Sequence, residues 1–139
     1  MLIQLLYTSI PVADTAQTIS EFIPVASEMN DKFGITGMII SSPTMFLQVI
    51  EGKRDHINQL YRNIVSDKRH KDCTLLRYST IKHREFPNWS MINSSVNEID
   101  QLYLNAIFSK GVFNVNTITG VQAMALLHIV SNDLNIKIT

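Results

Sequence analysis

The chain has 139 residues, 45% of them hydrophobic and 17% charged, a composition that suits one globular domain. Twelve basic residues balance twelve acidic ones without a basic stripe, which argues against a nucleic-acid binder. The single cysteine, Cys73, excludes an intrachain disulfide, and the four histidines lack metal-motif spacing, so no metal site is expected. Without a signal peptide or an apolar run of membrane-spanning length, we expect no membrane contact and a cytoplasmic setting.

The first elements are a strand and a long helix. In residues 2–9, Ile3, Leu5 and Tyr7 share one face at alternating positions, and this pattern predicts a strand. Residues 13–33 repeat apolar side chains at three- and four-residue spacing and predict a helix. Pro24 falls inside this pattern, so a kink or a break is expected there.

A hairpin, a second helix and a fourth strand follow. Residues 34–41 and 45–51 predict two strands joined by a short turn at Ser42-Pro43-Thr44. Residues 54–66 predict a helix, and residues 73–79 predict the fourth strand. The apolar face of the second helix is expected to hold Ile57, Leu60, Tyr61, Ile64 and Val65.

A short fifth strand is expected around residues 89–93, after Pro87. The order βαββαβ plus one strand is the split-βαβ plan of ferredoxin-like α+β folds. In that plan the first and third strands lie side by side at the sheet centre, with both helices on one face. Tyr7 and Gln48 would then be neighbours.

Two helices are expected in the tail, over residues 96–110 and 120–134, where they could cover the bare face of the sheet. We therefore divide the chain into a core, residues 1–95, and a helical cap, residues 96–139, for output or oligomerisation. The apolar positions expected on these helices are Ile99, Leu102, Tyr103, Ala106 and Ile107, then Val121, Met124, Ala125, Leu127, His128 and Val130. Candidate interface residues, if they do not pack on the sheet instead, are Ile107, Phe108, Val112 and Phe113.

The stretch FLQVIEG (46–52) places the amide of Gln48 inside an apolar strand. Burying that amide without partners costs about 1–3 kcal/mol. Tyr7 on the first strand and Asn30 at the end of the first helix add a phenol and a second amide to the same space. Each alone could be a satisfied core residue, and Asn30 could be a helix C-cap near Gly34. Together they suit a planar ligand with alternating donors and acceptors, such as the pyrimidine side of a flavin.

Five stretches carry a family resemblance: LLYTS (5–9), MNDKFGITGMII (29–40), FLQVIEG (46–52), SDKRH (66–70) and FPNWSM (86–91). In this order and spacing they resemble the BLUF family, blue-light sensors that use flavin. The resemblance covers about residues 1–95, and the tail is similar to the cap of short, stand-alone members.

The resemblance implies a role for each polar residue in this space. Tyr7 would donate an electron and a proton to the excited flavin. Gln48 would bridge the tyrosine and the flavin N5/O4 edge and then rotate or tautomerise, which strengthens its bond to O4 and shifts the absorption to the red. Asn30 would hold the O4/N3 edge of the ring.

Other positions match the family less directly. Trp89 and Met91, expected on strand five, would relay the change, although both could be simple packing residues. Ser9 could tune the tryptophan. The ribityl chain or phosphate of the flavin would lie near Asp67, Arg69 and His70, unless the last two belong to a solvated turn.

The expected function is therefore that of a blue-light photoreceptor, which binds FAD or FMN non-covalently and signals through a protein partner or a changed homo-oligomer. No cluster of nucleophile and base, and no plausible pair of carboxylates, favours an enzyme. The alternatives are a small flavin oxidoreductase on a ferredoxin-like fold, a light-inactive flavin-binding module, or a flavin-free dimeric module of the same fold.

Overall fold

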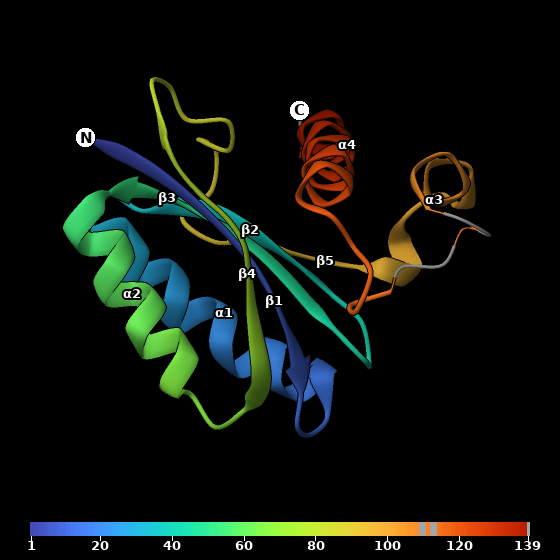
Figure 1. Cartoon of the computed structure of the whole chain (residues 1–139), viewed down its shortest axis with the longest axis horizontal. Helices are drawn as coiled ribbons and strands as arrows, with labels where there is room; N and C mark the ends of the chain where they lie inside the picture. The colour runs from blue at the N-terminus through green and yellow to red at the C-terminus, as the bar shows by residue number, and fades with distance from the viewer. Residues whose placement is uncertain (109–110, 112–113, 139) are drawn as a thin grey trace.

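The structure is a computed structural model, and it describes residues 1–108, 111 and 114–138 (Figure 1). The elements follow the order βαββαββ up to residue 95, and helices follow. The elements are β1 (Leu2–Pro11), α1 (Thr15–Lys32), β2 (Thr36–Ser41), β3 (Phe46–Lys53), α2 (Arg54–Ser66), β4 (His70–Ile81), β5 (Asn93–Ser95), the 3₁₀ turn η1 (Val96–Glu98), α3 (Gln101–Ile107) and α4 (Gly120–Ile138).

The strands form one mixed sheet in the order β4-β1-β3-β2-β5. The β1–β3, β1–β4 and β2–β3 pairs are antiparallel, and β5 joins β2 in parallel. The predicted ferredoxin-like plan, with β1 and β3 adjacent at the centre, is confirmed. In the β1–β3 ladder, Tyr7 and Gln48 are direct partners, so their side chains leave the sheet on the same face.

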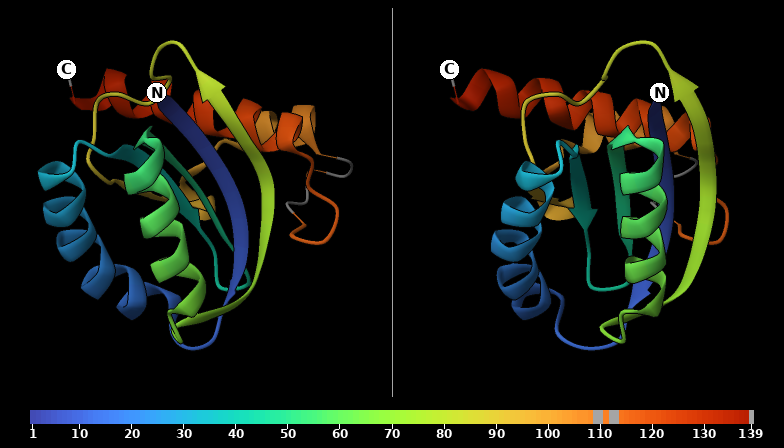
Figure 2. Two further views of the ribbon diagram at one scale, coloured as in Figure 1. Left: turned by 60° about the vertical axis from the view of Figure 1, so that its left-hand side comes forward. Right: turned by 90° about the vertical axis from the view of Figure 1, so that its left-hand side faces the viewer.

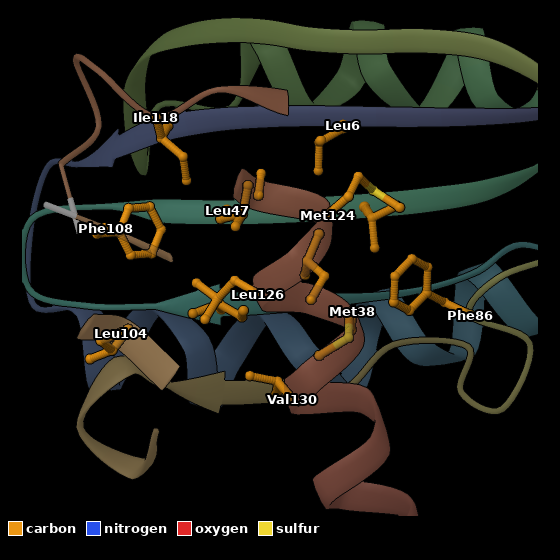
Figure 3. Packing of buried hydrophobic residues seen from close by; sticks show 14 residues of the cluster. Leu6, Met38, Leu47, Phe86, Leu104, Phe108, Ile118, Met124, Leu126 and Val130 are labelled. Atoms are coloured by element: carbon orange, nitrogen blue, oxygen red, sulfur yellow. The ribbon is translucent and has the colours of Figure 1, made fainter. Parts of the chain in front are cut away.

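Helices cover both faces of the sheet, as predicted. α1 and α2 lie side by side on one face, and α4 runs across the other with α3 beside it (Figures 1 and 2). Because side chains alternate along a strand, Ile3, Leu5 and Tyr7 join the core under α1 and α2, and Leu6 joins the core under α4. Figure 3 shows this second core, in which side chains from the sheet face those of α4.

Helix α1 runs unbroken through Pro24, so the alternative of a break at this position is wrong. Pro24 and Ser20, four residues earlier, both lie on exposed positions of the helix. The Ser20 carbonyl that loses its helical partner can therefore be hydrated. The helix starts at Thr15 because the Asp14 carboxylate accepts a hydrogen bond of 2.9 Å from the Gln17 N–H.

The fifth strand begins later than predicted. Residues 89–92 are irregular, and β5 covers Asn93–Ser95. Before the ladder starts, the Gly37 and Ile39 N–H groups of β2 donate to the carbonyls of Trp89 and Ile92, both at 2.9 Å. The prediction that Trp89 and Met91 lie on strand five is therefore wrong. They belong to the approach to that strand, which we call the β5 approach (residues 89–92).

The expected helix over residues 96–110 is divided at Asp100, whose carboxylate caps the start of α3. Of the tail residues predicted to be apolar contacts, Leu102 is 74% exposed and Val121 is 82% exposed, and Val65 of α2 is also exposed. Phe108 is buried and Ile107 packs against the same core, so these two are not a free interface. Lys110, Val112 and Phe113 lie outside the described residues.

The α4 face that meets the sheet also differs from the prediction. Ala123 and Leu126, not predicted, are fully buried, whereas Ala125 is exposed. None of the helices in the described part of the chain is long and apolar enough to cross a membrane.

Candidate functional site

Tyr7 and Gln48 form a buried hydrogen bond in the middle of the sheet. The Tyr7 hydroxyl donates to Gln48 Oε1, and the two residues are 3% and 1% exposed. Burial raises the pKa of the Tyr7 phenol well above its ordinary value, with smaller effects from Cys73 and Tyr61. The phenol is therefore neutral at physiological pH, and it holds its proton toward an acceptor that is already in place.

The other end of the Gln48 amide faces sulfur. Gln48 Nε2 lies 3.5 Å from the Sδ atom of Met91, which is buried. A thioether is a weak hydrogen-bond acceptor. By this distance, Met91 is the residue of the Trp89–Met91 pair that lies beside Gln48. Trp89 is only half-buried.

Asn30 is the third polar side chain in this region, and it is buried. Its Nδ2 donates to the Ser90 carbonyl at 2.8 Å. Its backbone carbonyl accepts hydrogen bonds from the N–H groups of Phe33 and Ile35. The C-cap of α1 is Phe33, so the alternative reading of Asn30 as the capping residue is wrong.

A cavity of about 230 Å³ opens beside these residues, between α1 and α2. A smaller cavity of about 40 Å³ next to it is lined by Tyr7, Asp67 and His70. Phe22, Ile64 and Arg69 line both cavities. The larger one is lined by Phe22, Val25, Ala26, Met29, Asn30, Gln48, Leu60, Asn63, Ile64 and Arg69.

This cleft fits a flavin. The apolar side chains of α1 and α2 suit the faces of a flat ring, and the amides of Asn30 and Gln48 offer donors and acceptors to its polar edge. Arg69 is exposed at the outer side, where a guanidinium can meet a phosphate. From the sequence, the apolar faces of α1 and α2 were predicted only to pack in the core. Periodicity shows which side of a helix is apolar, but it does not show that a cleft separates the two helices.

The SDKRH turn holds Arg69 by an ion pair. The Arg69 guanidinium contacts Asp67 through Nη2 at 2.6 Å and through Nε at 3.1 Å, and it lies 5.5 Å from the centre of the Phe22 ring. The hydrogen bonds from Arg69 lower the pKa of Asp67, so this carboxyl is ionised at neutral pH. Asp67 therefore orients the arginine at the mouth of the cleft.

His70 begins β4 and is half-buried, with one ring nitrogen near β1 and the other near α2. Its Nδ1 lies 2.7 Å from the Ser9 hydroxyl, and its Nε2 is within hydrogen-bond distance of the Ile64 carbonyl. The described partner of Ser9 is thus His70, and a role for Ser9 in tuning the tryptophan stays a prediction.

The fold and this site define a class: a split-βαβ domain with a buried phenol–amide pair beside a cleft that fits a flavin. The family model described as "Sensors of blue-light using FAD" matches residues 2–92. The chain belongs to this family, the BLUF domains, and is a blue-light sensor that uses a flavin.

Three comparisons place the chain among its relatives. The photoactivated adenylate cyclase subunit beta of Euglena longa is 31% identical over 83 residues, which are 60% of this chain and 10% of that protein. The chain thus spans about a tenth of the length of this relative. The dark-state structure of the BLUF protein BlrB is 29% identical with a TM-score of 0.77, covering 95% of this chain and 96% of that one. The photo-activated state of BlsA has a TM-score of 0.84, covers 94% and 95% of the two chains and, at 23% identity, supports the fold alone.

Proposed function

We propose that Tyr7 and Gln48 are the light-driven switch of this sensor. The observation that carries the proposal is that the two ends of the Gln48 amide have hydrogen-bond partners of different strength. Its oxygen accepts a bond from the Tyr7 hydroxyl, and its nitrogen lies beside the sulfur of Met91, a weak acceptor. A bound flavin supplies the absorption of blue light and, once excited, the capacity to take an electron.

The chain's own residues then move a proton and an amide. Loss of an electron makes the Tyr7 hydroxyl strongly acidic, and Gln48 Oε1 already accepts that hydrogen bond. An amide has a donor end and an acceptor end, so rotation of Gln48 or its tautomerisation changes what it offers to every neighbour. A neutral hydrogen bond is worth about 1 kcal/mol, and the sulfur contact is weaker, so rotation gives up little on the Met91 side. That small difference can bias two states by a few-fold.

We assign flavin binding to the cleft between α1 and α2. Asn30 and Gln48 would hold the polar edge of the ring, and Asp67, Arg69 and His70 would lie toward the ribityl chain and phosphate. FMN and FAD share the ring, the ribityl chain and the first phosphate, so both suit this assignment.

The signal, on this proposal, leaves through residues 96–139, which act as an output and oligomerisation segment beside the sensory core of residues 1–95. Exposed Leu102 and Val121 on the tail helices support a contact with a protein partner or a second copy of the chain. The single free cysteine, half-buried Cys73, suits a reducing, cytoplasmic compartment. The light signal would then be read by a protein in the same compartment.

A light-minus-dark absorption difference spectrum of the purified, flavin-loaded protein tests the switch. We expect a red shift of the flavin band under blue light, with return in the dark. Bound flavin without a shift would contradict the proposal, and assays of NAD(P)H turnover would then test for an oxidoreductase.

A further inference from the structure

Ser90, between Trp89 and Met91, is held by helix α1 through two hydrogen bonds. Its hydroxyl lies 2.6 Å from the Ser27 hydroxyl, and its carbonyl accepts a bond of 2.8 Å from Asn30 Nδ2. Ser27 and Asn30 are three residues apart and so face the same way on the helix. One turn of α1 therefore holds one residue of the β5 approach by two hydrogen bonds.

The opposite side of the β5 approach is fixed to the sheet. The Gly37 N–H donates to the Trp89 carbonyl and the Ile39 N–H donates to the Ile92 carbonyl, both at 2.9 Å. Met91 lies between these two attachments, and its sulfur is 3.5 Å from Gln48 Nε2. An unbranched methionine has three rotatable bonds, so the position of its sulfur depends on how well the flanking backbone is held.

We propose that Ser27 and Ser90 are positioning residues, a serine latch that holds Met91 against the Gln48 amide in the dark. The proposal rests on the Tyr7–Gln48 switch. In the dark arrangement the amide nitrogen donates to Met91, and the latch favours that arrangement. When Gln48 changes orientation, the contact with sulfur is lost and Met91 is no longer held in place. Ser90 then transmits the change in the position of Met91 to α1 and to the edge of β2.

The latch predicts a kinetic effect without loss of the primary shift. Ser27→Ala removes one hydroxyl and keeps a good helix former, so the protein should fold and the light-induced red shift should remain. Because the latch favours the dark arrangement, thermal return after illumination should slow by up to about five-fold, the factor that corresponds to one hydrogen bond. Ser90→Ala should do the same, and Ser90→Thr, which keeps a hydroxyl, should restore the rate.

A matched control lies on the same helix. Among the described residues, the Ser20 hydroxyl bonds only to the Gln17 carbonyl within α1, so Ser20→Ala should leave the recovery rate unchanged. A second readout needs no light: in the dark, hydrogen exchange of the Gly37 and Ile39 amides should become faster in Ser27→Ala, because their acceptors belong to the β5 approach.

A double variant separates positioning from general loosening. In a Met91→Leu background, which lacks the sulfur, Ser27→Ala should have no further effect on recovery. An equal effect of Ser27→Ala in both backgrounds, or recovery at the wild-type rate in both single serine variants, would overturn the latch and leave the switch standing. Absence of any red shift in the wild-type protein would overturn both.

Discussion

Gln4 on β1 and Glu51 on β3 are joined by a buried hydrogen bond of 2.8 Å on the face of the sheet opposite Tyr7 and Gln48. The Glu51 carboxylate also accepts bonds from the backbone N–H groups of Glu85 and Phe86, at 3.1 and 2.8 Å. It thereby ties the loop after β4 to the sheet centre. The same loop contacts α4, where the His128 ring stacks on Phe86 with centroids 4.8 Å apart.

We predict that Glu51→Ala destabilises the protein by about 3 kcal/mol, because it leaves two backbone donors and the Gln4 amide without this acceptor. Glu51→Gln should cost less, because an amide oxygen can still accept one of these bonds. Urea unfolding followed by circular dichroism measures both changes. Glu28→Gln, at an exposed position of α1, is the control. A loss below about 0.5 kcal/mol in Glu51→Ala would show that this network does not support the loop.

Replacement of Tyr7 by Phe tests the electron and proton donor. The variant keeps the ring and removes the hydroxyl that bonds to Gln48 Oε1, so flavin should still bind and the light-induced red shift should disappear. Gln48→Leu should also lose the shift, since it removes the switchable amide. Difference spectra are the measurement, and Tyr103→Phe, on the exposed side of α3, is the control. A red shift that survives in Tyr7→Phe would assign the donor to another residue.

Met91 and Trp89 should differ in their effect on recovery. Met91→Leu removes the sulfur beside Gln48 Nε2, whereas Trp89→Ala removes a half-buried side chain and keeps the backbone bond to Gly37. We expect both variants to retain the red shift, with the larger change in dark-recovery rate in Met91→Leu, at most about five-fold because a sulfur contact is weaker than an ordinary hydrogen bond. A larger effect of Trp89→Ala would mean that the tryptophan relays the signal.

Alkaline pH should reveal the burial of Tyr7. The pKa of this phenol is raised in the folded state, so above about pH 10 the unfolded chain releases the proton and the folded chain keeps it. Stability attributable to this group is therefore intact below about pH 10 and falls as the pH rises, by at most about 1.4 kcal/mol per pH unit. Urea unfolding at about pH 9 and about pH 11 should show a smaller loss for Tyr7→Phe than for wild type. Equal losses would mean that Tyr7 ionises freely in the folded protein.

The central pair was predictable from the sequence because its placement needs only two facts. The alternation in β1 and β3 sets which side chains share a face, and the split-βαβ order makes these strands neighbours. Tyr7 and Gln48 then have to meet. The contact between Gln48 and Met91 was not predictable, because it depends on the path of an irregular segment that pattern analysis misplaced as a strand.

Tertiary contacts account for the other differences. The sequence predicts Glu51 only as the last residue of the strand over 45–51, since nothing local shows that the loop after β4 folds back to supply its donors. The short β5 exists because the edge of β2 offers hydrogen bonds, not because of its own propensity. The division of the first tail helix had a readable signal, the capping residue Asp100.

Replacement of Arg69 tests the binding of the flavin phosphate separately from the binding of the ring. The guanidinium lies at the mouth of the cleft and is oriented by Asp67. We expect Arg69→Gln to weaken FMN binding about ten-fold, since a hydrogen bond to a charged group is worth roughly 1.5–3 kcal/mol. Riboflavin lacks the phosphate, so its affinity should stay the same. Quenching of flavin fluorescence on titration measures both.

Arg62→Gln is the matched control, because Arg62 is an exposed arginine of α2 whose guanidinium bonds to Gln59 on the same helix. Equal weakening of FMN and riboflavin by Arg69→Gln would mean that the arginine shapes the cleft through its contact with Phe22. Unchanged affinity for both would place the phosphate away from the SDKRH turn. Selective loss of FMN affinity would assign the outer end of the cleft to the phosphate and, with it, the inner end to the ring beside Gln48.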